Sequence, residues 1–151
     1  MINEIFYKLF RNKDWDPANT SYLKYFESPD TFTSINEASF SLLLENVGSL
    51  ESKDVLDLGG GAGNYSNRFL EQGSRVIYTD ISKGMVEIAR KNIKKANLHF
   101  ENIDFKVLNP NSINELDKYF DLIFIRHLWC YSFSDKKFAK KIKKKLKENG
   151  Y

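Results

Sequence analysis

The sequence has a single cysteine, Cys130, among its 151 residues. One cysteine cannot form an internal disulfide, which excludes the small disulfide-stapled secreted domains. No run of about 18 apolar residues is present, so no transmembrane helix is predicted. Residues 1–10 have no basic flank, no long apolar stretch and no small-residue cleavage site, so they do not resemble a signal peptide. These absences predict a cytoplasmic domain without membrane partners.

Excess positive charge is confined to one segment of the chain. The chain carries 23 Lys and Arg against 20 Asp and Glu, a net charge of +3. Residues 135–148 hold eight lysines and two acids, so the rest of the chain has a net charge of −3. We expect a helix there, with Phe138 and Ile142 on its buried face. A solvated outer face explains the lysines better than RNA binding, because aromatic residues are not interleaved with them.

The pattern of apolar residues changes near residue 50. Residues 1–50 predict helices, one over 2–10 and another over about 34–47 that buries Leu42 and Val47. From residue 51 onward, short apolar runs alternate with helical periods, which predicts crossover units and a parallel α/β sheet. The expected strands cover residues 55–58, 75–79, 98–103 and 120–125. The expected helices cover residues 64–72 and 134–147, with another that begins after Ser82 and a short one after Asn109.

A glycine-rich segment follows the first expected strand and its Asp57, with glycines at Gly59, Gly61 and Gly63. The dinucleotide pattern Gly-x-Gly-x-x-Gly would require glycine at position 64, where this chain has asparagine. An acid beside the loop repels phosphate but suits an ammonium group. Asp80, at the end of the second expected strand, can accept hydrogen bonds from two ribose hydroxyls. These features indicate a nucleoside with a cationic tail and no phosphates, such as S-adenosylmethionine.

Three stretches resemble the class I S-adenosylmethionine-dependent methyltransferases: DVLDLGGGAGNYSNRFLEQGSRVIYTDISKGMVEIARKNI at 54–93, ENIDF at 101–105 and YFDLIFI at 119–125. The resemblance covers roughly residues 51–151. It implies an α/β fold, a three-layer Rossmann-like parallel sheet with strand order 3-2-1-4. Residues 1–50 would then form a helical N-terminal lid segment over the cofactor cleft, and residues 51–151 an incomplete cofactor-binding core.

The resemblance also implies a role for individual residues. Asp80 would bind the ribose, although a helix-capping role is the alternative. The methionine moiety would contact Asp57, Gly59, Gly61 and Gly63. The adenine would contact Ile81, Met85, Asp104 and the Phe105 backbone. Met85 could equally be a core residue, and Asp104 an ordinary surface carboxylate. We expect valine at Gly63 to block the cofactor and leave the fold mostly intact. No metal is expected.

The resemblance places the segment after the fourth expected strand near the methyl acceptor. Arg126 and His127 would border the transferred methyl group, and His127 could accept a proton from the attacking atom. A structural or positioning role for His127 is equally open. An Asn-Pro-Pro-aromatic signature would have suggested the amino groups of bases or glutamine, but residues 126–129 are RHLW. A small-molecule acceptor is therefore expected, with tRNA or protein as the second choice.

Two other functions fit parts of the pattern. A non-catalytic cofactor-binding or interaction module would bind S-adenosylmethionine without turnover. A nicotinamide-dependent dehydrogenase is disfavoured by Asn64 and Asp57. The family that this chain resembles adds three strands beyond the fourth, and Tyr151 would begin the next one. We therefore expect an amino-terminal fragment that is inactive alone and is either marginally stable or self-associates through an exposed, apolar fourth strand.

Overall fold

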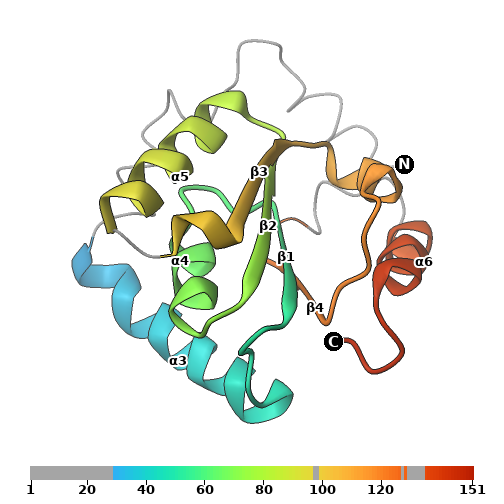
Figure 1. Cartoon of the computed structure of the whole chain (residues 1–151), viewed down its shortest axis with the longest axis horizontal. Helices are drawn as coiled ribbons and strands as arrows, with labels where there is room; N and C mark the ends of the chain where they lie inside the picture. Colours follow the sequence, from blue (N-terminus) through green and yellow to red (C-terminus); the bar gives the residue numbers. More distant parts are fainter. Residues whose placement is uncertain (1–28, 97–98, 127, 129–134) are drawn as a thin grey trace.

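The computed structural model describes residues 29–96, 99–126, 128 and 135–151 (Figure 1). In this part, four parallel strands form a sheet of order β3-β2-β1-β4. The strands are β1 (Asp54–Leu58), β2 (Arg75–Asp80), β3 (Ile103–Val107) and β4 (Leu122–Ile125). The predicted parallel sheet and its order 3-2-1-4 are confirmed. The helix expected over 2–10 lies outside the described residues.

Helices cover both faces of the sheet, so the molecule has three layers (Figure 1). One side carries α3 (Pro29–Val47), α4 (Asn64–Glu71) and α5 (Lys83–Ala96), and the other carries η3 (Pro110–Glu115) and α6 (Asp135–Lys145). A short 3₁₀ turn, η2 (Phe100–Asn102), precedes β3. None of these described helices is long and apolar enough to span a membrane.

The side chains of β1 alternate between two hydrophobic cores. Val55 belongs to the cluster shared with α3, α4 and α5, and Leu56 and Leu58 belong to the cluster shared with η3 and α6. All five residues of β1 are buried, as expected for a parallel strand that is covered on both faces. Burial on two sides therefore extends to the two acids of this strand, Asp54 and Asp57.

The third strand begins five residues later than the sequence analysis predicted. The expected range, 98–103, ends where β3 starts, and residues 100–102 form η2 instead. Phe100 reaches the core from this turn, with its ring centroid 5.9 Å from that of Phe105. An apolar residue can thus pack against the core without being part of the sheet, and the strand itself covers residues 103–107. Asp104 is consequently inside the strand, opposite Ile77 of β2.

Helix α3 begins at Pro29, earlier than expected, and presents a different face to the core. Leu42 is 59% exposed, whereas Phe40 is buried. The ring of Phe40 lies 5.6 Å from that of Phe69 and 6.4 Å from that of Tyr65. The prediction that Leu42 is buried is wrong because this aromatic cluster, which comes from α4, selects the face of α3.

The outer edge of β4 is partly paired within the chain. Tyr151 N donates to Asp121 O and Ile123 N donates to Tyr151 O, both at 2.9 Å. Phe120 forms a parallel bridge with Leu146. The first half of β4 is therefore covered by residues 146–151. Self-association through this strand remains a prediction for the other half.

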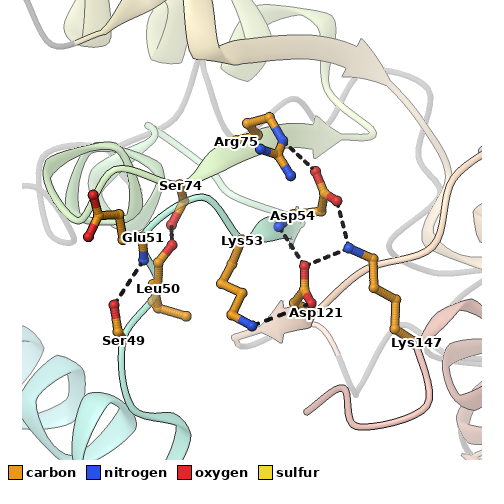
Figure 2. Close-up of polar contacts among 9 residues, drawn as sticks. All are labelled: Ser49, Leu50, Glu51, Lys53, Asp54, Ser74, Arg75, Asp121 and Lys147. Carbon is orange, nitrogen blue, oxygen red and sulfur yellow. Dashed lines mark hydrogen bonds and ion pairs between the residues drawn. The ribbon is translucent and has the colours of Figure 1, made fainter.

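A cluster of charged side chains joins the starts of β1, β2 and β4 (Figure 2). Asp54 binds Arg75 Nε and Lys118 Nζ at 2.9 Å and Lys147 Nζ at 2.7 Å. Lys147 Nζ also lies 2.7 Å from Asp121 Oδ2, which accepts from Asp54 N at 2.8 Å. Burial would raise the pKa of Asp54, but the hydrogen bonds from these three cations outweigh it and hold the pKa well below its usual range. The cluster therefore favours the folded state wherever Asp54 is ionised.

Replacement of Asp54 by asparagine should test this cluster. We expect Asp54→Asn to lower the free energy of unfolding at neutral pH by about 1.5–3 kcal/mol, since it removes charge-assisted hydrogen bonds. A lowered pKa stabilises the native state above the unfolded pKa, so the difference should shrink as pH falls below about 3.9. Urea unfolding across this pH range measures both effects. Glu51→Gln, an exposed acid near the same edge, is the control and should change little.

Candidate functional site

The loop between β1 and α4 is held by the end of β2. Thr79 O accepts hydrogen bonds from Gly59 N and Gly60 N, both at 2.9 Å. The hydroxyl of Tyr78 donates to Gly61 O, and Asn92 Nδ2 of α5 donates to Ala62 O at 3.1 Å. The loop thus has a defined backbone conformation that is fixed by the protein itself.

Asp80, the last residue of β2, is 9% exposed and faces this loop. One carboxylate oxygen accepts from Gly61 N at 3.1 Å and the other from Ser82 N at 2.8 Å. The side-chain cap of α5 is Ser82, whose Oγ accepts from Met85 N at 3.0 Å. Asp80 thus contacts both the glycine loop and the start of α5 through its two carboxylate oxygens.

Asp57 is a buried acid under the same loop, with 2% of its surface exposed. Ser66 Oγ donates to its Oδ2 at 2.7 Å. Burial raises the pKa of Asp57 to about 7; the Ser66 hydrogen bond opposes this shift, and the charge of Asp80 reinforces it. A cationic group placed beside Asp57 would favour its ionised form.

The glycines of the loop differ in what surrounds them. A Cβ at Gly59 would lie 2.8 Å from Leu128 Cδ1, and one at Gly60 would lie 2.6 Å from the Tyr78 ring. A Cβ at Gly61 would meet no atom within 4 Å. Gly61 therefore borders open space, on the loop that Asp57 and Asp80 flank.

Gly63 is required by helix packing. Its φ is +88°, and a Cβ there would lie 3.1 Å from Ala89 Cβ and from Ile93 Cδ1 of α5. The expectation that valine at this position leaves the fold mostly intact is wrong, because a branched side chain would separate α4 from α5 and strain the backbone. In a Gly63 variant, a loss of cofactor binding could therefore not be distinguished from a loss of stability.

Of the residues expected around the adenine, only some lie at the carboxyl ends of the strands, beside the glycine loop. Ile81 follows Asp80 directly and is 57% exposed, whereas Met85 is buried and packs in the protein. Asp104 and Phe105 are the second and third residues of β3, well before its carboxyl end. The half-buried ring of Phe105 packs against that of Tyr78 at 5.4 Å.

Sequence reasoning missed Asn109 at this edge. Val107 pairs with Asp80, and Leu108 N donates to Asp80 O at 2.8 Å, so Asn109 follows beside the end of β2. Its side chain accepts from Asn111 N at 2.9 Å and caps η3. The signal was present as Asn-Pro after an apolar run, but it was interpreted only as a helix start.

Arg126 connects three elements at the end of β4. Its guanidinium lies over the Tyr65 ring, 5.2 Å from the centroid, and donates to Asn36 Oδ1 of α3. The Tyr65 hydroxyl donates to the same oxygen at 3.2 Å. His127 lies outside the described residues. Within the described part of the chain, no cluster of His, Cys, Asp and Glu is suited to a metal ion.

Comparison with known families agrees with this geometry. A methyltransferase domain family matches residues 55–150, most of the chain. The chain belongs to the methyltransferase domain family. The resemblance to class I S-adenosylmethionine-dependent methyltransferases is thus confirmed for family and fold.

Two curated relatives illustrate the range of methyltransferases to which this methyltransferase-domain protein is similar. It is 32% identical over 90 residues to a ribosomal RNA small subunit methyltransferase A of Mycoplasmopsis synoviae, covering 60% of this chain and 33% of the relative. It is 33% identical over 105 residues to a ubiquinone biosynthesis O-methyltransferase of Pelagibacter ubique, covering 67% and 40%. The chain thus spans well under half the length of these two relatives.

Solved structures share the same fold. A protein of Methanococcus maripaludis described as an S-adenosylmethionine-dependent methyltransferase has a TM-score of 0.70 and 25% identity, covering 84% of this chain and 58% of that one. Magnesium protoporphyrin IX methyltransferase from Synechocystis PCC 6803 has a TM-score of 0.71 and 17% identity, covering 95% and 71%. The latter similarity concerns the fold alone.

The buried acid of this methyltransferase domain should make its stability pH-dependent. Folding raises the pKa of Asp57 from 3.8 to about 7, so the native state retains a proton that the unfolded chain has lost. Stability should therefore fall as pH rises between about 4 and 7, by up to about 1.4 kcal/mol per unit, and level off above.

Asp57→Asn should remove this dependence, so that the variant gains on the parent protein as pH rises through the window. Urea unfolding at stepped pH measures the slope, and Asp117→Asn, at an exposed acid, is the control. A slope that persists without Asp57 would contradict the assignment.

Proposed function

We propose that this chain carries the cofactor-binding part of an S-adenosylmethionine-dependent methyltransferase. The observation that carries the proposal is the open space at Gly61, on a loop flanked by the carboxyl groups of Asp57 and Asp80. This combination fits a nucleoside with a cationic tail. It does not fit a pyrophosphate, which two nearby acids would repel.

Each acid has a distinct role in the proposal. Asp80 would accept hydrogen bonds from the ribose hydroxyls, because it stands at the carboxyl end of β2 and a carboxylate oxygen can accept more than one hydrogen bond. Asp57 would face the ammonium group, whose charge would lower its raised pKa and favour the carboxylate. Ile81 would contact the adenine from the exposed side, with Asn109 rather than Asp104 as the polar residue at that edge.

The chemistry then depends on alignment. S-adenosylmethionine, when bound, supplies a methyl group already activated by a sulfonium. The protein has to hold the acceptor in line with the carbon–sulfur bond, an effect that can contribute roughly 7–11 kcal/mol. We assign acceptor-side roles to Arg126, which Tyr65 and Asn36 hold in place, and to His127 as the base.

We further propose a small molecule as the acceptor and residues 1–50 as a lid. The sequence RHLW after β4 does not match the signature for amino groups of bases or glutamine. The contact from Asn36 to Arg126 and Tyr65 supports the lid, since it attaches α3 to the carboxyl edge of the sheet.

Gly61→Ala should test the placement of the cofactor. Asp80 is a poor probe because its carboxylate also holds the loop, so a loss of binding would have two causes. Gly61 and Gly48 both have positive φ, +54° and +72°, and at neither would a Cβ meet an atom within 4 Å. Alanine should strain both positions similarly, by about 1–2 kcal/mol.

Calorimetry with S-adenosylmethionine should then show at least about a tenfold loss of affinity for Gly61→Ala and none for Gly48→Ala. Undiminished binding to Gly61→Ala would mean that the cofactor lies elsewhere. A parallel titration with a nicotinamide dinucleotide should show no binding.

His127→Ala should separate catalysis from binding. Without its base, the turnover of the complete methyltransferase that carries this part should fall by about 10²–10⁴-fold, while cofactor affinity stays within a few-fold. The acceptor is first identified by mass spectrometry of methylated products from a metabolite pool, with RNA and protein pools alongside. His99→Ala, at the other histidine, is the control. Cofactor binding by the complete methyltransferase without product from any pool would favour a non-catalytic module. Equal pH–rate profiles of the parent and His127→Ala proteins would exclude His127 as the base.

A further inference from the structure

The eight lysines of residues 136–147 fall into two groups in the folded protein. Three have partners within the structure. Lys141 Nζ donates to Asn111 O, Lys145 Nζ donates to Leu116 O, and Lys147 pairs with the carboxylates of the Asp54 cluster. These three attach α6 and the following segment to the rest of the protein.

The other five lysines are exposed and have no such structural role. None of them makes an ion pair with another described residue; they are Lys136, Lys137, Lys140, Lys143 and Lys144. Like charges three or four residues apart on a helix each cost about 0.2–0.5 kcal/mol. The five lysines span about 12 Å of helix. We call them the lysine ridge.

An exposed aromatic side chain lies beside Lys145, the residue that directly follows the last lysine of the ridge. Tyr119 is 60% exposed, and Lys145 Nζ is 5.6 Å from its ring centroid. Phe120 N donates to Lys145 O at 2.9 Å, so the backbone fixes Tyr119 beside α6. In the sequence, Tyr119 and Lys145 are 26 residues apart. The objection that no aromatic residue accompanies the lysines therefore holds for the sequence but not for the folded protein.

We propose that the lysine ridge and Tyr119 form a docking surface for single-stranded nucleic acid. The lysines would contact successive phosphates, and the tyrosine ring would stack on an unpaired base. A membrane surface fits less well, because Phe138 of α6 is buried and Ile142 and Leu146 pack against the core, which leaves no apolar face to insert. The surface goes beyond the proposed methyl transfer, since a docked strand need not be the methyl acceptor.

Charge removal at matched sites tests the ridge. Lys136, Lys140 and Lys143 are changed together to glutamine in one variant, and Lys91, Lys94 and Lys95, exposed on α5, in the control. Fluorescence anisotropy with a labelled single-stranded RNA and a DNA of the same sequence is measured over a range of salt. We expect the ridge variant to bind at least about tenfold more weakly at low salt, with its salt slope reduced by roughly 2. The α5 control should bind as the parent protein does.

A second pair of variants tests the stacking platform. Tyr119→Ala should weaken binding by about 5- to 150-fold without changing the salt slope, and Tyr119→Phe should retain binding. Circular dichroism and thermal unfolding establish that every variant is folded. Cofactor titration of the same proteins should be unchanged, so failure of the proposed methyltransferase function would appear in a separate measurement.

Several results would overturn the docking surface. One is an equal loss of binding in the ridge and α5 variants, which would indicate non-specific attraction. Another is binding to vesicles of anionic phosphatidylglycerol without binding to either nucleic acid. A third is Tyr119→Ala behaving as the parent protein. A preference for RNA over DNA, or the reverse, identifies which nucleic acid the surface binds.

Discussion

The carboxyl end of β2 determines the shape of the candidate site. The loop after β1 has to turn sharply while its backbone amides stay paired, and Thr79 O and the Asp80 carboxylate accept from three of them. Because parallel pairing fixes β2 against β1, these acceptors lie where the loop needs them. The site is thus organised before any ligand arrives, which reduces the ordering cost of binding.

The two edges of the sheet use charge in opposite ways. At the amino edge, the acids have cationic partners, and their ionised forms stabilise the fold. At the carboxyl edge, Asp57 is buried and has no cation among its hydrogen-bond partners in the described part of the chain, and its ionised form is disfavoured. Binding of a cation would relieve this cost. A buried acid whose raised pKa lowers the stability of the fold is a pattern found at functional sites.

Local patterns predicted β1, β2, the glycine loop and the cap of α5, because each depends on neighbours in the sequence. What could not be predicted depends on distant residues. The face of α3 is selected by the aromatic rings of α4, and β3 was placed too early because Phe100 reaches the core from a turn. The need for glycine at position 63 comes from α5, some 26 residues away. His127 remains a prediction.

The cluster around Asp54 also bears on how the molecule opens. It links the first residues of β1 and β2 to the start of β4 and to the segment after α6, all at one end of the sheet. The glycine loop lies at the other end, where neutral hydrogen bonds predominate. Partial opening should therefore start at the loop and leave the end that carries the Asp54 cluster intact. The site can then open locally without global unfolding.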